Sequence, residues 1–301
     1  MSDSVGRVRI GIDIGGTGTR VVSISGDDRV QDSANFPTPP AGGADPLQFL
    51  SNAIRSVAGG ATIAALGIGA SGPIDARGVI RNPDTLEAFT GVDLLEPLSL
   101  EFGIGARIDN DAVTAALYEA HLGVAAGAPS VLVITLGTGV GVALILDGTP
   151  VRGADGVHPE AGHLNVNVAN CQCYCGRDSC WEQAASRAGL ERLAIRSGRA
   201  ELTALADTAR TGDAAARGLF EMYGLRVAMG LSDLVGIYRP TTVVFAGGST
   251  RYWDLIEHGV REGLAATHSA PEPQILLSSA GPYGGAIGAT LFDREPGASK
   301  K

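Results

Sequence analysis

The sequence predicts an α/β fold built from two related halves. Apolar strand patterns alternate with helical patterns along the chain, which is typical of α/β proteins. A unit of strand, glycine-rich turn and strand occurs near residues 8–24 and again near residues 131–146. With 301 residues and 45% hydrophobic content, the chain is long enough for one large or two ordinary domains. The repeated unit favours two domains that arose by duplication.

The first unit begins with a strand over residues 8–14, which breaks at the glycine-rich segment 15–19. An extended pattern resumes at residues 21–24, and a helix is expected over residues 46–57. A further buried strand closes at the glycine turn of residues 66–73.

A strand over residues 106–109 leads directly into a helix over residues 111–123. Asn110 and Asp111 stand at the junction, where a short polar side chain caps the first turn of a helix.

The second unit repeats the pattern of the first, with strands over residues 131–135 and 142–146 around the turn 136–141. A long helix is expected over residues 213–235. A third glycine turn, 247–250, follows the apolar strand 242–246 and leads into a helical pattern. These elements complete the expected alternation of strands and helices.

The glycine turns are candidate phosphate sites, because successive backbone N–H groups in such turns form nests for phosphate oxygens. A single turn of this kind is more often an ordinary hairpin, but three together, with hydroxyls from Thr17, Thr19 and Thr138, favour phosphate binding. None matches G-x-G-x-x-G between a strand and a helix, which disfavours a dinucleotide site. Lys300 and Lys301 are the only lysines, so neither a GK[ST] P-loop nor a Schiff-base enzyme is expected.

One short segment gathers His163 and all four cysteines, Cys171, Cys173, Cys175 and Cys180. Thiolates and imidazole are the preferred ligands of tetrahedral zinc, and four of them close a structural site, so the segment offers one donor too many. The alternative is a disulfide cluster. No signal peptide and no apolar run long enough to span a membrane are apparent, so a reducing cytoplasm is expected, which favours metal.

The chain is acidic, with a formal net charge of -9 and an isoelectric point near 5.0. This charge would repel a phosphodiester backbone, and no basic stripe reverses it locally. Neither nucleic acid nor a membrane is therefore expected as a partner.

Four carboxylates are candidates for chemistry. Asp13 ends the first strand beside a glycine turn, where it could hold Mg²⁺ through water or simply satisfy turn amides. Asp111 could accept a hydroxyl proton during phosphoryl transfer or only cap its helix. Glu160, in the run HPEAGH, and Glu182 flank the cysteine segment. They are either surface charges or hydrogen-bond acceptors for a polyol.

Five motifs together resemble the ROK family, which includes bacterial glucokinases. They are GIDIGGTGT at 11–19, NDA at 110–112, LGTGVG at 136–141, EAGH at 160–163 and CYCGRDSCWE at 173–182. The resemblance covers residues from about 8 to about 292. It implies an actin-like ATPase (ribonuclease H-like) fold with an ATP and sugar cleft between two domains, and a homodimer.

The implied domains are a smaller N-terminal α/β domain over residues 1–112, completed by a C-terminal helix at about 284–301, and a larger domain over residues 113–283 that carries the zinc motif.

The resemblance also implies which donors hold the zinc. The family places its first motif cysteine ten residues after the EAGH histidine, and Cys173 stands ten residues after His163. The ligands would be His163, Cys173, Cys175 and Cys180, with Cys171 the spare donor and the zinc structural.

Site roles follow from the same resemblance. Asp111 resembles the catalytic base, and Asn110 a partner of a sugar hydroxyl. Glu160, His163 and Glu182 resemble the residues that bracket the sugar ring. Gly72 is the remaining substrate-binding candidate.

The expected ATP and Mg²⁺ contacts lie in the three turns and at the end of the first strand. They are Asp13, Gly15, Gly16, Thr17, Gly18, Thr19, Gly137, Thr138, Gly139, Gly247 and Gly248.

The sequence departs from the family pattern at several positions. The sugar-contacting PNL segment reads Pro83-Asp84-Thr85-Leu86, followed by Phe89, and His158 stands where a small residue is usual. These departures affect the fine specificity of the sugar pocket.

The expected activity is ATP-dependent phosphorylation of a hexose at its 6-hydroxyl, in carbohydrate metabolism and glycolysis, with glucose as the first acceptor. N-acetylmannosamine, N-acetylglucosamine, mannose and fructose are alternatives, and polyphosphate is an alternative donor. A non-catalytic sugar-binding regulator is the alternative of another class. A DNA-binding repressor is disfavoured, because the first strand begins by about residue 8 and leaves no room for a helix-turn-helix.

Overall fold

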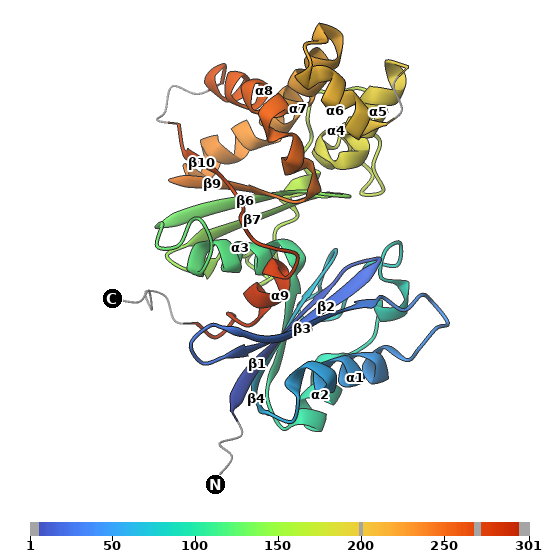
Figure 1. Ribbon diagram of the computed structural model, residues 1–301, viewed down its shortest axis with the longest axis vertical. Coiled ribbons are helices and arrows are strands. Elements are labelled where there is room, and N and C mark those ends of the chain that lie inside the picture. Colours follow the sequence, from blue (N-terminus) through green and yellow to red (C-terminus); the bar gives the residue numbers. More distant parts are fainter. Residues whose placement is uncertain (1–5, 199–200, 268–271, 295–301) are drawn as a thin grey trace. The chain divides into compact units, whose positions relative to one another are not determined.

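The computed structural model describes residues 6–198, 201–267 and 272–294. These residues form a mixed α/β structure with two five-stranded sheets (Figure 1). The predicted α/β class is confirmed. By its internal contacts the chain divides into two compact units. The first comprises Met1–Ser130, Ala143–Pro159 and Ser279–Lys301, and the second comprises Val131–Val142 and Glu160–Ser278.

The sheet of the first unit has the strand order β3-β2-β1-β4-β5. Its strands are β1 (Arg7–Ile14), β2 (Gly18–Ser25), β3 (Val30–Pro37), β4 (Thr62–Ala70) and β5 (Ala106–Asn110). β1 and β2 are the antiparallel pair that the glycine turn predicts, and β2 pairs antiparallel with β3. β1, β4 and β5 run parallel, and Ile14 is in register with Ala70, which is in register with Asn110. The carboxyl ends of three neighbouring strands therefore meet at one edge.

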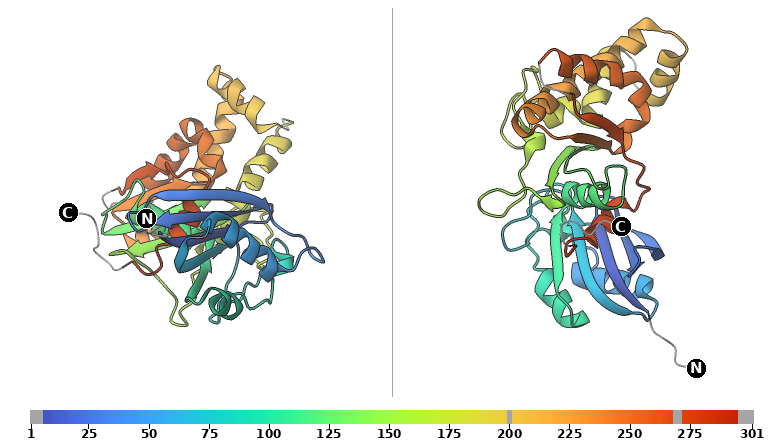
Figure 2. Two further views of the ribbon diagram at one scale, coloured as in Figure 1. Left: turned by 60° about the horizontal axis from the view of Figure 1, so that its bottom comes forward. Right: turned by 90° about the vertical axis from the view of Figure 1, so that its left-hand side faces the viewer.

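Helices α1 (Pro46–Ala58) and α2 (Leu95–Phe102) cover one face of this sheet (Figure 2). The isoleucines of β1 alternate toward them, and Ile10, Ile12 and Ile14 are fully buried in the core that results. Burying such side chains contributes about 1.5–3 kcal/mol each. This core fixes β1 and with it the position of Asp13.

Helices α3 (Asp111–His121) and α9 (Gly284–Ala289) lie on the opposite face, where α9 contacts β1, β2 and β4 (Figure 1). The approach is close because the strands present glycine there. A Cβ at Gly11 would lie 1.9 Å from the carbonyl oxygen of Ala286, and one at Gly67 would lie 1.9 Å from that of Ala289. The two glycines thus allow the backbone of α9 to rest on the sheet.

The second sheet has the strand order β10-β9-β6-β7-β8. Its strands are β6 (Ser130–Leu136), β7 (Val140–Leu146), β8 (Thr149–Pro150), β9 (Thr242–Ala246) and β10 (Gln274–Leu277). β6, β9 and β10 are parallel, and β7 and β8 form an antiparallel pair. The division between the compact units passes through β7.

Between β8 and β10, the described residues form five α-helices. They are α4 (Trp181–Ala185), α5 (Arg187–Arg196), α6 (Leu202–Arg210), α7 (Ala214–Tyr238) and α8 (Trp253–Ala265). α7 and α8 pack along each other, and Trp181 of α4 is fully buried beneath α7 with its indole N–H donated to the carbonyl of Arg226. This packing fixes α4, which begins directly after Cys180.

The predicted helices correspond to α1, α3 and α7, each with ends within three residues of the expected ones. The compact units, however, have other bounds than the predicted domains. We expected the first domain to end at residue 112, whereas α3 belongs with the first unit because it packs on α9. The domain division itself stays a prediction, and residues 295–301 of the predicted C-terminal helix lie outside the described residues. Within the described residues, no helix combines the length and the apolar character needed to cross a membrane.

Candidate active site

Asp111 stands where three parallel strands end, at the first position of α3. Asn110, and not Asp111, caps this helix, because the side-chain oxygen of Asn110 accepts the N–H of Ala112 at 2.8 Å. The printed N-cap hydrogen bond of α3 thus comes from Asn110. Its Oδ2 accepts a hydrogen bond of 2.8 Å from the hydroxyl of Ser71, which follows β4. Burial raises the pKa of Asp111, and the hydrogen bond from Ser71 opposes that rise.

A second carboxylate acts on the same edge of the sheet. Asp13 lies at the end of β1, and Arg20 reaches its Oδ2 at 3.4 Å. Burial, and after it repulsion from the Asp111 charge, raises the pKa of Asp13 to about 6, while Arg20 acts in the opposite direction. Two acidic groups that disfavour each other's ionisation form an electron-rich site suited to a proton or a cation.

The turn after β4 is held by two asparagine side chains. Asn110 donates its side-chain N–H to the carbonyl of Gly72 at 3.0 Å, and Asn82 donates to the carbonyl of Ser71 at 3.0 Å. Gly72 has a φ of 86°, in the left-handed region that favours glycine. The structure thus joins Gly72, Asn110 and Asp111, three of the predicted substrate residues. Phe89, the aromatic after the PDTL segment, is fully buried in the core of this unit.

The first predicted phosphate turn, Gly15 to Thr19, connects β1 and β2 and is closed by a hydrogen bond of 3.1 Å from the N–H of Gly15 to the carbonyl of Gly18. Gly16 and Thr17 are exposed. Thr19 is fully buried, and its hydroxyl lies 2.9 Å from that of Thr38, which donates to the carbonyl of Gly15. The Thr19 hydroxyl therefore braces the turn from within.

The other two glycine turns follow neighbouring strands of the second sheet, β6 and β9. Gly137, Thr138 and Gly139 join β6 to β7, with a hydrogen bond of 3.0 Å from the N–H of Gly137 to the carbonyl of Gly139. A Cβ at Gly247 would lie 2.6 Å from the carbonyl oxygen of Leu136, the residue before this turn. Gly247 and Gly248 thus approach the end of β6. The structure brings the two predicted turns together.

The four predicted metal ligands form one cluster. The Nδ1 of His163 and the Sγ atoms of Cys173, Cys175 and Cys180 all lie within 4.8 Å of one another. A zinc tetrahedron with the usual bond lengths has S···S edges of ~3.8 Å and N···S edges of ~3.6 Å. The Sγ atoms of Cys175 and Cys180 are 3.9 Å apart, and the Nδ1 of His163 lies 3.3 Å from the Sγ of Cys180 and 3.6 Å from that of Cys173. The donor set fits zinc.

Cys171 lies outside this cluster. It is buried, and its thiol faces the carbonyl of Ala169 at 3.8 Å. All four cysteines are free thiols, so the disulfide alternative is not realised. The structure therefore brings together the four predicted donors and leaves Cys171 outside them.

Glu182 contacts both the group of four predicted metal ligands and the glycine turn between β6 and β7. It is the second residue of α4, so it follows Cys180 closely. Its Oε2 accepts the N–H of Val140 at 3.3 Å, and its Oε1 lies 4.0 Å from the Nδ1 of His163. Glu160 is exposed and precedes the short 3-10 helix Ala161–His163, with its carbonyl accepting the N–H of His163 at 3.1 Å.

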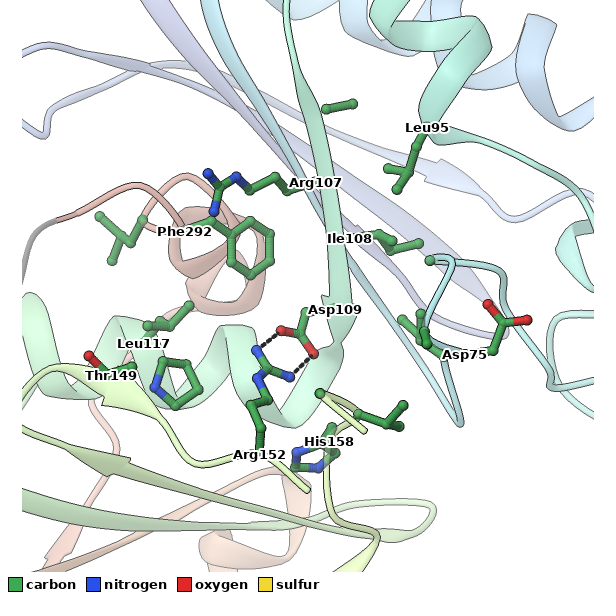
Figure 3. A pocket seen from close by; sticks show the side chains of 18 of the residues that line it. Asp75, Leu95, Arg107, Ile108, Asp109, Leu117, Thr149, Arg152, His158 and Phe292 are labelled. Carbon is green, nitrogen blue, oxygen red and sulfur yellow. Dashed lines mark hydrogen bonds and ion pairs between the residues drawn. The ribbon is translucent and has the colours of Figure 1, made fainter. Parts of the chain in front are cut away.

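A cavity of about 460 Å³ lies within the first unit, beside β5 (Figure 3). The guanidinium of Arg152 forms two hydrogen bonds with the carboxylate of Asp109 there, and burial lowers the pKa of His158 beside them to about 4. His158 is not among the metal-cluster residues. The lining includes none of the predicted substrate, nucleotide or metal residues, so this cavity is not the predicted sugar site.

With this geometry described, the chain can be compared with known proteins. A profile of the ROK family matches residues 9–295. The chain belongs to the ROK family. This confirms the resemblance inferred from the five motifs.

Proteins similar to this chain include a glucokinase of Streptomyces coelicolor, 29% identical over 95% of this chain and 98% of that protein. Among solved ROK structures, a hexokinase from Thermus thermophilus is 31% identical with a TM-score of 0.80, covering 94% of this chain and 97% of its own. A Streptomyces griseus glucokinase solved with glucose and AMPPNP is 28% identical with a TM-score of 0.78, covering 94% and 98%. The fold is therefore the actin-like ATPase fold of these hexokinases.

Several residues that were not predicted contact the predicted site residues of this ROK chain. Ser71 bonds Asp111, Asn82 holds the turn at Gly72, and Arg20 pairs with Asp13. Tyr174 contacts His163. Ser71 and Tyr174 stand inside recognisable motifs, whereas only the folded sheet reveals the contact of Arg20.

Proposed function

We propose that this ROK protein transfers the γ-phosphoryl group of ATP to the 6-hydroxyl of a hexose, with glucose as the preferred acceptor. The support comes from the likeness to glucokinases and hexokinases over nearly the whole chain. It comes also from the local geometry of Asp111.

The observation that carries the proposal is that Asn110 caps α3, while the neighbouring Asp111 carboxylate is held by Ser71 at the edge where three parallel strands end. A general base has to hold a proton for part of the reaction, so a carboxylate whose pKa is raised by burial is suited to that role. Ser71 orients the carboxylate by donating to Oδ2, and the backbone N–H of Ala112 adds to this, so that the carboxylate is positioned to accept the proton of a substrate hydroxyl.

In the proposed step, the hexose 6-hydroxyl gives its proton to Asp111 as its oxygen bonds to the γ-phosphorus of ATP. The bond between that phosphorus and the β,γ-bridging oxygen breaks, and ADP leaves with the electron pair. Asn110 and the turn at Gly72 would bind sugar hydroxyls, and Glu160, His163 and Glu182 would bracket the ring.

The nucleotide would be held by backbone N–H groups of the glycine turns and by a magnesium ion. Mg²⁺ would neutralise charge on the phosphates, with Asp13 as its protein partner through water. The exposed Thr17 and the turns at Gly137 and Gly247 are the proposed phosphate and nucleotide contacts. Zinc would be structural, held by His163, Cys173, Cys175 and Cys180.

The first test is the replacement Asp111→Asn, which keeps the shape of the side chain and removes its basicity. We expect kcat to fall by about 10²- to 10⁴-fold, while glucose binding measured by calorimetry changes little. Asp147→Asn, at an exposed turn, is the matched control and should keep full activity. An Asp111→Asn enzyme with normal turnover would refute the role of this residue.

The acceptor is tested with a panel of glucose, mannose, fructose, N-acetylglucosamine and N-acetylmannosamine, each with ATP and with polyphosphate. We expect the highest kcat/KM for glucose with ATP, measured by detection of the sugar phosphate, the product common to both donors. A higher value for another sugar or donor would replace the preferred substrate and leave the phosphotransferase reaction standing.

A non-catalytic sugar-binding regulator is the alternative. It predicts glucose binding without binding of ATP and Mg²⁺, and calorimetric titration with both ligands separates the two functions.

A further inference from the structure

The Nε2 atom of His163 has a partner that the proposed function does not use. The Nδ1 of this imidazole faces the cysteine sulfurs, at 3.3 Å from Cys180 and 3.6 Å from Cys173. On the other side of the ring, Nε2 lies 3.1 Å from the phenol oxygen of Tyr174. The two rings meet edge to face, with centroids 5.2 Å apart and planes at 85°.

This arrangement fixes the direction of the hydrogen bond. An imidazole that binds a metal through Nδ1 carries its remaining proton on Nε2, so Nε2 is a donor. The phenol oxygen of Tyr174 then accepts. A neutral imidazole has only this one N–H, and it points to one partner at a time.

A sugar hydroxyl would need the same N–H. The proposed function assigns His163 to the sugar ring, and the present inference rests on that assignment. Tyr174 is 69% exposed although its phenol is bonded to His163, so its side chain can turn into solvent without opening a core.

We propose that Tyr174 is a specificity-determining residue that occupies the sugar's place at His163 in the empty enzyme. A sugar binds only if its hydroxyl replaces the phenol on the single Nε2–H of His163. Acceptors with a well-placed hydroxyl at that position would displace Tyr174, and acceptors without one would leave the phenol in place.

The test is Tyr174→Phe, which keeps the ring and removes the oxygen. The Kd of glucose should fall by about 2- to 10-fold, because sugar binding then no longer has to break one exposed hydrogen bond. Calorimetry on the zinc-loaded full chain measures this Kd. KM should fall in parallel, with kcat within about 2-fold, because no atom of Tyr174 takes part in the phosphoryl transfer. Tyr238→Phe, a half-exposed tyrosine at the end of α7, is the control and should leave Kd unchanged.

A Kd of glucose that rises or stays the same in Tyr174→Phe overturns the proposal. If Tyr174→Phe weakens glucose binding, the phenol is a sugar contact, and if Kd is unchanged, the phenol does not compete. A second measurement does not depend on turnover. In the sugar-free protein, ¹⁵N-imidazole NMR should show a slowly exchanging Nε2 proton of His163 that exchanges faster in Tyr174→Phe.

The two hypotheses fail in different ways. If wild-type protein phosphorylates no hexose, the proposed function fails whatever Tyr174 does. If wild-type protein is an active kinase and Tyr174→Phe shows neither tighter binding nor a changed Nε2 proton, only the role of Tyr174 fails.

Discussion

The folded protein favours the protonated form of Asp13, so the ionised form destabilises the folded state at neutral pH. Its pKa of about 6 lies above the ordinary 3.8, mainly because of burial. The folded state thus binds the proton more tightly than the unfolded chain. Its contribution to stability is largest below pH 3.8, declines as the pH rises toward 6, and is lowest above that value. A buried carboxylate with a raised pKa is typical of functional sites.

Replacing Asp13 with Asn should therefore stabilise the protein at neutral pH. We expect the free energy of unfolding to rise by about 1–3 kcal/mol at pH 8 and by less at pH 5, because Asn has no charge to bury. Urea unfolding at both pH values measures the difference. Activity should fall, since the proposed partner of the magnesium ion is lost.

Asp28→Asn is the matched control for this experiment. Asp28 is as little exposed, but its carboxylate lies 2.6 Å from Arg9 and 3.2 Å from Arg294. Breaking these partly buried ion pairs should destabilise the protein. Equal effects of the two replacements, or a gain for Asp13→Asn that is larger at pH 5, would contradict our account of Asp13.

At the scale of elements, the sequence predicted those whose causes are local. The hairpin of β1 and β2 follows from an alternating strand and a glycine turn, and α7 from a long helical pattern. The clustering of His163 with Cys173, Cys175 and Cys180 could also be predicted, because their spacing is a property of one segment and one family. The bond from Ser71 to Asp111 could not, since it exists only because β4 and β5 end side by side.

Helix α9 shows why some elements could not be predicted from local sequence patterns. Its six residues, GGAIGA, include three glycines, which are poor helix formers. Packing against β1, β2, β4 and α3 determines its conformation. The family resemblance, and not local propensity, indicated a helix there.

The contact of α9 with β4 can be tested at Gly67. In Gly67→Ala the new Cβ would lie 1.9 Å from the carbonyl oxygen of Ala289, so helix or strand must shift. We expect a loss of about 1–3 kcal/mol or more in the free energy of unfolding. Gly26→Ala, at a glycine with nothing within 4 Å of the added carbon, should change stability little. Equal unfolding free energies of the two variants would show that α9 does not rest on β4.

The cysteine segment yields a prediction about zinc stoichiometry. We expect one zinc per chain by elemental analysis in the wild type and in Cys171→Ser, because Cys171 is not among the clustered donors and its thiol lies 3.8 Å from the carbonyl of Ala169. Cys180→Ser should lose most of its zinc, since it removes one of four ligands. Loss of zinc in Cys171→Ser would contradict the assigned ligand set.

For the whole molecule, we expect removal of zinc to weaken the binding of glucose more than the binding of ATP. His163 and Glu182 lie at the cluster, whereas Gly247 and Gly248 approach the end of β6 and are not cluster residues. We expect chelation to weaken glucose binding by about 10-fold or more before the Kd of ATP changes. Calorimetric titrations of both ligands, before and after treatment with a chelator, measure this order. Equal losses for the two ligands would indicate general unfolding.

The assembly of the protein stays a prediction. The family resemblance implies a homodimer of this 30.7 kDa chain. Light scattering coupled to gel filtration should then give a mass twice that of the chain at micromolar concentration. A mass of one chain under the same conditions would remove the homodimer from the expected properties.

The position of α9 in the chain has a consequence for biosynthesis. The strands of the first unit leave the ribosome early, yet the face of their sheet that carries Val22 and Ile24 is covered by Ala286 of α9. That helix is made only after the whole second unit, Glu160–Ser278 included. Until then the nascent chain presents an uncovered apolar surface, the kind of surface that chaperones bind. This face of the first unit's sheet therefore reaches its native packing only after α9 has been synthesised.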